Sequence, residues 1–243
     1  MEEKFDYYDI FAVVMPGLLA LGCFLYISPH NGAIWTGLVN LTLGGSILVC
    51  LISYLIGELV QGLAKLLEWA IWKLHKGKPL SWLVDGENCF WRCASSEIAS
   101  DHELKTIRNA ICSSKKDFAV TLPSAYKRIK EIAYSNQTCK HEATISQAKA
   151  NMSRGVLTIS LFMLLLSISA LIVKHKEFAP LQKYILQYSF LKLYAMAAIS
   201  FITSIITLYR FRFHAINHTK AIISGCALVW EKDTMAKQDN NER

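Results

Sequence analysis

The sequence predicts an all-α integral membrane protein with four transmembrane helices, of which the second is long and extends into a helical cytoplasmic insert. Two observations lead to this fold class. Of the 243 residues, 53% are hydrophobic and only 19% are charged, a balance too apolar for an ordinary soluble domain. The apolar residues also gather into four runs, and each run is close to the length of about 20 residues that crosses a bilayer as a helix.

The four runs set the order of the elements. The expected spans cover residues 8–27, 34–58, 155–173 and 191–208. The first run is interpreted as a retained helix rather than a signal peptide, because its start, MEEKFD, is net acidic and no small-x-small cleavage site follows it. The second run continues without proline to residue 75, so we expect a single helix that crosses the membrane and then enters the solvent.

The spans divide the chain into four segments. These are an N-terminal hairpin with the helix extension (residues 1–75), a basic helical insert (76–154), a second hairpin (155–209) and a cytoplasmic helix with a disordered tail (210–243). The insert has thirteen Lys and Arg, whereas the loop near residues 28–33 has none, so both termini and the insert are expected in the cytoplasm. Four lysines in or beside the loop expected outside oppose this orientation: Lys174, Lys176, Lys183 and Lys192.

One face of the second helix is polar at both ends and apolar between them. At about 100° per residue this face carries Asn40, Gly44, Ile47, Leu51, Tyr54 and Glu58. An ion pathway can use such a face, with Ile47 and Leu51 as an apolar gate and Glu58 at the cytoplasmic mouth. Helix packing can use the same residues, and from this helix alone packing is the favoured interpretation.

Hydroxyl side chains recur in the last two spans. We expect them to bond to neighbouring helices or to their own backbone. The residues are Ser160, Ser167, Ser200, Thr203, Ser204 and Thr207. A coupled transporter usually carries ionisable residues at mid-depth, and these spans carry almost none, so the pattern favours an oligomeric pore over a transporter.

The insert is the candidate binding region for an anionic ligand. It has thirteen Lys and Arg against eight Asp and Glu. The clustered candidates are Lys115, Lys116, Lys127, Arg128 and Lys130. The anionic inner leaflet of the membrane is the alternative partner, and it is the favoured one for the juxtamembrane residues Lys73, Lys76, Arg210 and Arg212.

The motifs do not indicate an enzyme. The sequence has no Walker A loop, no HExxH and no GxSxG. A zinc site would draw on Cys89, Cys93, Cys139 and His141, with His102 or Cys112 as substitutes, but these spacings fit no common zinc pattern. Arg212 and His218 loosely resemble the Arg/His signature of HEPN ribonucleases. We expect neither a cofactor nor a metal, and no disulfides on the cytoplasmic side.

Two short pieces, FDYYDIFAVVMPGLLAL and YLIGELVQGL, resemble small bacterial four-span membrane proteins of anti-phage defence operons. Pro16-Gly17 and Tyr54-x-x-Gly57 carry the resemblance, with Glu58 where a histidine would be expected. Candidate relatives are the membrane components of the Kiwa and Hailong systems. The resemblance implies a homo-oligomer of the inner membrane that acts with a cytoplasmic partner. In Hailong-like systems this partner makes a nucleotide signal that opens the membrane protein.

Together these observations predict a homo-oligomeric effector of anti-phage defence, with a tetramer as the working assumption. It would sit in the bacterial inner membrane and form an ion-conducting pore gated by a cytoplasmic nucleotide or oligonucleotide. The alternative is a non-conducting membrane scaffold that senses infection and recruits a cytoplasmic partner protein. A membrane-tethered ribonuclease or zinc enzyme is the third hypothesis.

Overall fold

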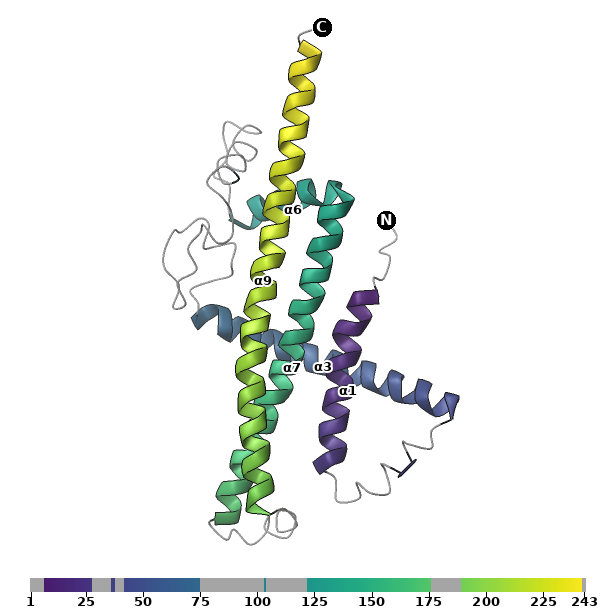
Figure 1. The fold of residues 1–243 in the computed structure, drawn as a ribbon, viewed down its shortest axis with the longest axis vertical. Coiled ribbons are helices and arrows are strands. Elements are labelled where there is room, and N and C mark those ends of the chain that lie inside the picture. The colour runs from purple at the N-terminus through teal and green to yellow at the C-terminus, as the bar shows by residue number, and fades with distance from the viewer. Residues whose placement is uncertain are drawn as a thin grey trace. The chain divides into compact units, whose positions relative to one another are not determined.

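The computed structural model describes residues 7–27, 36–37, 42–74, 103, 122–175 and 189–241. Over these ranges the chain is almost entirely helical and has no strand. The long helices are α1 (Tyr7–Ile27), α3 (Leu43–Leu74), α6 (Leu122–Ser135), α7 (Gln137–His175) and α9 (Phe190–Asn241) (Figure 1). Four of them, α1, α3, α7 and α9, are long and apolar enough to cross a membrane, by length and composition. The prediction of an all-α chain with four such helices is confirmed.

Three helices have an N-cap residue whose side chain bonds to the first turn. The oxygen of the capping side chain accepts a hydrogen bond from a backbone N–H of that turn, at 3.4 Å for α3, 3.0 Å for α7 and 3.2 Å for α9. Such a bond satisfies one of the N–H groups that a helix start leaves without an intrahelical partner. The capping residues are Thr42, Asn136 and Ser189.

Two helices extend beyond the apolar runs that predict them. α7 begins at Gln137, although the expected third span begins only at residue 155. α9 continues to Asn241 and so includes residues 235–241, which were predicted to belong to the disordered tail. Met, Ala, Lys and Gln in this stretch are favourable helix formers, which allows the helix to propagate. The second helix, expected from residue 34, is described as α3 from Leu43 onward.

The helices form two compact units, which are described separately. Unit 1 comprises Met1–Glu68 and Ala148–Phe211, and unit 2 comprises Trp69–Gln147 and Arg212–Arg243. α3, α7 and α9 each contribute residues to both units. The described residues of the expected ion pathway therefore belong to unit 1, and the described basic candidates belong to unit 2.

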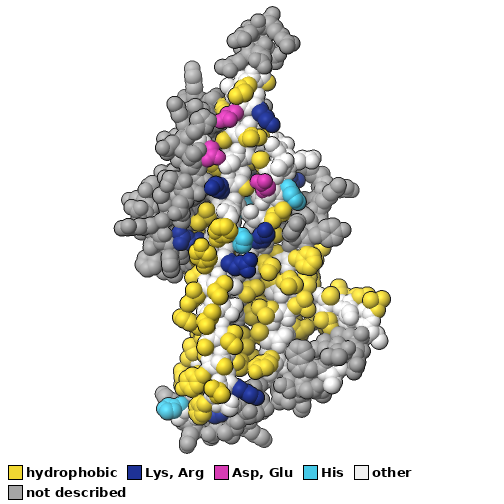
Figure 2. Space-filling model, in the orientation of Figure 1, with side chains coloured by type: hydrophobic (Ala, Val, Ile, Leu, Met, Phe, Trp, Pro, Cys, Tyr) yellow, Lys and Arg dark blue, Asp and Glu magenta, His cyan; other side chains and the backbone are white. Residues whose placement is uncertain are grey.

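Unit 1 has a small core to which four helices contribute. Val60 of α3 and Ile159 and Met163 of α7 form its buried centre. The partly buried side chains packed against this centre are Ala20, Cys23, Ile27, Ile56 and Met196. Many large apolar side chains of these helices remain exposed, and Figure 2 shows hydrophobic side chains gathered on the part of α9 that belongs to unit 1. Extensive exposed apolar surface is typical of helices that face lipid or other subunits.

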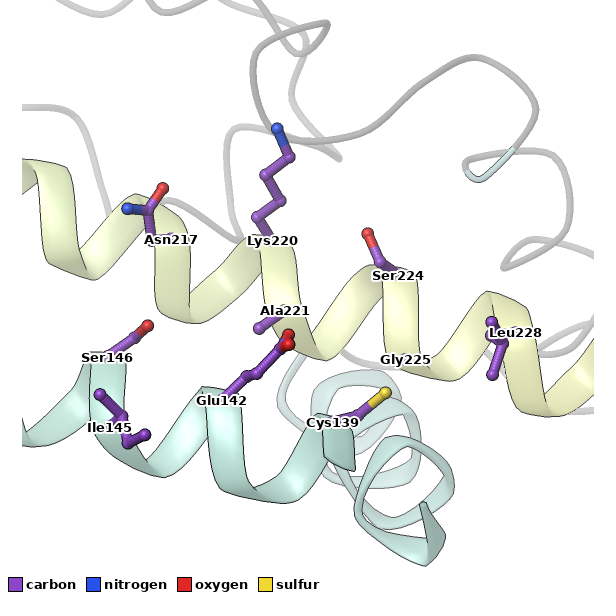
Figure 3. A pocket seen from close by; sticks show the side chains of 10 residues that line it. All are labelled: Cys139, Glu142, Ile145, Ser146, Asn217, Lys220, Ala221, Ser224, Gly225 and Leu228. Carbon is purple, nitrogen blue, oxygen red and sulfur yellow. The ribbon is translucent and has the colours of Figure 1, made fainter. Parts of the chain in front are cut away.

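Unit 2 is held together by small and branched apolar side chains of α6, α7 and α9. Gly225 of α9 makes the close approach possible, since a Cβ there would lie 2.8 Å from Cβ of Cys139 in α7. The completely buried apolar side chains are Ala133, Ala143, Ile222, Ile223 and Cys226. This packing supports a groove between α7 and α9, which Figure 3 shows.

Candidate functional site

The two motifs behind the family resemblance meet where α1 packs against α3. A Cβ on Gly17 would lie 1.7 Å from the carbonyl oxygen of Ser53, and one on Gly57 would lie 2.1 Å from the carbonyl oxygen of Val13. No side chain fits at such distances, so both positions require glycine for the backbones to approach. The motif glycines thus have a packing role of the kind found between membrane helices.

A buried polar network links the same part of α3 to α1 and α7. Nε2 of Gln61 donates to the carbonyl oxygens of Ala12 in α1, at 2.9 Å, and Asn151 in α7, at 3.0 Å. Arg154 of α7 donates from one Nη to Oε1 of Gln61 at 2.9 Å, and its other Nη forms an ion pair with Glu68 of α3. Gln61 and Arg154 are both buried. One amide therefore ties three helices together and is itself held by an ion pair.

The network was not among the residues predicted from the sequence. A signal for it exists, because Gln61 interrupts an apolar run and Arg154 stands directly before another. Polar side chains at such positions are costly without partners and usually have them. The sequence did not predict that Gln61 and Arg154 bond to each other, since the two residues are 93 positions apart.

The face of α3 opposite this packing is exposed. Ser53, Gly57 and Gln61 lie on the packed side and are buried. The centre of the other side is a seam of residues spaced alternately by four and three positions, a spacing that follows one face of a helix. The seam consists of Gly44, Leu48, Leu51, Leu55, Glu58 and Gly62, and every member is exposed.

The expected ion-pathway residues lie on or near this seam. Gly44, Leu51 and Glu58 are members of it, and Ile47 is exposed beside it, with 55% of its surface accessible. Tyr54 is only half-buried and lies at the edge of the packed side, one turn before Glu58. Asn40 lies outside the described residues.

Hydroxyl side chains in the expected spans of α7 and α9 bond to the backbone of their own helices. Four of them donate to the carbonyl oxygen four residues earlier, at distances of 2.6–2.8 Å. They belong to Ser160, Ser167, Ser204 and Thr207. This agrees with the expectation that these hydroxyls bond to their own backbone.

The basic candidates of the insert are only partly described. Lys115 and Lys116 lie outside the described residues, and so does the side chain of Arg128. Lys127 is exposed, and its Nζ lies 4.0 Å from Oε1 of Glu131. Nζ of Lys130 lies 5.0 Å from the centre of the Tyr134 ring.

His218 of α9 bonds to the backbone of α7 within unit 2. Its Nδ1 lies 2.9 Å from the carbonyl oxygen of Ala143, and since a carbonyl only accepts, Nδ1 carries the proton. The residue follows the expected fourth span, which ends at residue 208. Burial lowers the pKa of His218 below its ordinary value, the bond to Ala143 opposes this, and the charge of Lys130 lowers the pKa further. A histidine of this kind is predominantly neutral at pH 7.

The zinc hypothesis rests mostly on residues outside the described ranges, namely Cys89, Cys93, His102 and Cys112. Among the residues that the structure describes, no group of three or more His, Cys, Asp or Glu side chains is placed to hold a metal ion. Cys139, the described cysteine of this set, is a free thiol that lines the groove of unit 2.

No protein-family model, curated protein or solved structure matches this chain. The features that bear on function are therefore the exposed seam of α3, the polar network behind it and the surfaces of unit 2.

Proposed function

We propose that the protein is a homo-oligomeric membrane effector in which copies of α3 surround an ion-conducting pore. The pore would be gated by a nucleotide or oligonucleotide signal acting on the cytoplasmic unit. The resemblance of α1 and α3 to membrane proteins of defence operons supports anti-phage defence in the bacterial inner membrane as the setting. A cytoplasmic protein that produces the signal is the expected partner.

The observation that carries the proposal is the exposed seam of α3. Lipid alone requires no particular order of residues on an exposed face. The seam instead combines two glycines, three leucines and one carboxylate in a spacing that keeps them on one line. Glu58 lies about 22 Å along the helix from Leu43, near the cytoplasmic end of a bilayer core of about 30 Å.

The side chains of the seam suit separate roles in a pore. Leu51 and Leu55 are 58% and 65% exposed and would form an apolar constriction that closes by excluding water. Glu58 would contribute one carboxylate per subunit to a ring that attracts cations. The Gln61–Arg154–Glu68 network would hold α3 so that this side faces the axis, which makes its members positioning residues.

Flux through proteoliposomes tests the proposal. Leu51→Asn should hydrate the constriction and raise K⁺ leak about tenfold or more over the unsubstituted protein. The matched control is Ile52→Asn, since Ile52 is also exposed but lies about 100° away around the helix. ATP, a cyclic dinucleotide and a short oligonucleotide should be added in separate trials to find a ligand that opens the unsubstituted pore.

The outcomes separate the two leading hypotheses. A leak that rises with Leu51→Asn and not with Ile52→Asn supports a pore lined by this seam. Equal leak in both variants would mean that polar substitutions merely disturb the helix. No conductance in any variant, together with co-purification of a cytoplasmic protein, would favour the scaffold.

A further inference from the structure

Pro16 stands in the interior of α1 and removes one hydrogen bond from that helix. Proline has no backbone N–H, so it cannot donate to the carbonyl oxygen of Ala12, four residues earlier. Ala12 is 3% exposed, so water has little access to this carbonyl. In an apolar setting a backbone carbonyl without a donor is costly, and a neighbouring helix commonly supplies the donor that a proline withholds.

Gln61 of α3 supplies this donor. Its Nε2 donates to the carbonyl oxygen of Ala12 at 2.9 Å and to that of Asn151 in α7 at 3.0 Å, so both N–H groups of the amide are used. The other end of the amide accepts a hydrogen bond from Arg154, at 2.9 Å from Oε1. Because a guanidinium only donates, this bond fixes which end of the amide faces α1.

Close packing surrounds the same point. The side chain of Pro16 is completely buried. A Cβ on Gly155 of α7 would lie 2.8 Å from Cγ of Pro16 and 3.0 Å from Nε2 of Gln61, so glycine at this position leaves room for the ring and the amide together. The proline, the amide and the glycine belong to three different helices of unit 1. A movement of α1 at Pro16 therefore disturbs its contacts with both other helices.

We propose that Pro16 is a hinge of α1 and that Gln61 is its latch, which Arg154 holds closed. With the amide in place α1 keeps one angle at Pro16, because a change of this angle moves the Ala12 carbonyl away from Nε2. When the amide leaves, this carbonyl loses its donor and the turn before Pro16 opens. The ion pair of Arg154 with Glu68 acts on the bend of α1 through the amide. The device concerns the shape of unit 1 and does not depend on conduction.

Amide hydrogen exchange of the full-length protein in lipid nanodiscs, read by mass spectrometry, tests the latch. Gln61→Leu removes the donor and keeps a side chain of similar size. The amides of α1 around Pro16 should then exchange about tenfold faster, the effect of leaving one buried carbonyl without a donor. Gln61→Glu should have a similar effect, because an ionised carboxylate pairs with Arg154 but has no N–H to donate. Gln147→Leu, at an exposed position of α7, is the control and should leave α1 unchanged.

Replacement of the proline distinguishes a latch from a side chain that only fills space. In Pro16→Ala, residue 16 regains an N–H that bonds to Ala12 within α1, so the latch is no longer required. Adding Gln61→Leu to Pro16→Ala should then change the exchange of α1 by less than about twofold. A side chain that only fills space would raise the exchange equally with and without the proline.

Three results would overturn the proposal. They are an equal rise in both backgrounds, exchange in Gln61→Leu no faster than in Gln147→Leu, and protection of α1 in Gln61→Glu equal to that of the unsubstituted protein. If Gln61→Leu alone does not fold, the double variant decides. A folded double variant supports the latch, and an unfolded one shows that Gln61 is needed for another reason and overturns the proposal.

Discussion

Single residues in this chain show how a polar side chain becomes tolerable inside an apolar bundle. The amide of Gln61 would be costly to bury alone, but its Nε2 has two carbonyl acceptors and its Oε1 has a guanidinium donor. Arg154 in turn has Glu68 as counter-ion. Each group is partnered by the next, so the loss of one member removes a partner from another.

Substitution of Arg154 should therefore be strongly destabilising. Arg154→Met leaves Glu68 without this counter-ion and Oε1 of Gln61 without this donor, and breaking a buried pair in this way costs about 3–5 kcal/mol. Thermal unfolding of the detergent-solubilised protein, followed by circular dichroism, measures the effect. Lys149→Met, at an exposed position of the same helix, is the control. Equal midpoints for both variants would show that the network does not stabilise the fold.

His218 makes stability depend on pH. In the unfolded chain a histidine takes up a proton near pH 6.5, whereas the lowered pKa of His218 resists protonation in the folded state. The unfolded state then binds more protons, so stability falls as the pH drops below about 6.5 toward the folded-state pKa. His218→Gln should reduce this loss between about pH 7.5 and 5.5. An unchanged pH slope, matching that of the exposed-site control His141→Gln, would contradict the assignment.

At the scale of elements, hydropathy predicted where helices exist but not which sides meet. The four apolar runs became α1, α3, α7 and α9 because a helix is the way to satisfy the backbone in an apolar setting. Residues 137–154 were expected in the helical insert, but their continuity with the third span in one helix was not predicted, because they are polar and lack an apolar run. Tyr54 was placed on the candidate pathway face with Leu51 and Glu58, although it lies at the packed edge, because the sequence of one helix does not reveal its neighbours.

Two glycines of α3 test which side is packed. Gly57→Ala places a methyl group 2.1 Å from the carbonyl oxygen of Val13, so α1 and α3 must move apart, at a cost of about 1–3 kcal/mol. Gly62→Ala meets no atom within 4 Å and should be neutral or stabilise the helix by up to about 1 kcal/mol. Thermal midpoints of the two variants give the comparison. If Gly62→Ala were the more damaging change in the isolated protomer, the assignment of the two faces would be wrong.

At the scale of the whole molecule, the orientation across the membrane decides which compartment each end of α3 faces. Counts of Lys and Arg favour cytoplasmic termini, with Lys174 and its neighbours as the exceptions. Local structure accounts for Lys174, which lies in the last turn of α7, where the helix dipole favours a cation, with Nζ 4.7 Å from the centre of the Phe190 ring. This lysine has a local stabilising role, so its weight as a topology signal is reduced.

Reporter fusions in a bacterial host measure the orientation directly. Green fluorescent protein fused after Arg243 should fluoresce, because it folds in the cytoplasm, and alkaline phosphatase fused after Ser189 should be active, because it requires the periplasm. Exchanging the two reporters at the same positions should abolish both signals. The opposite pattern would put the Glu58 end of α3 outside, and a cytoplasmic signal would then have to act at the Gly44 end. Because the proposed gating requires unit 2 and Glu58 on the cytoplasmic side, this result bears on the pore before any current is recorded.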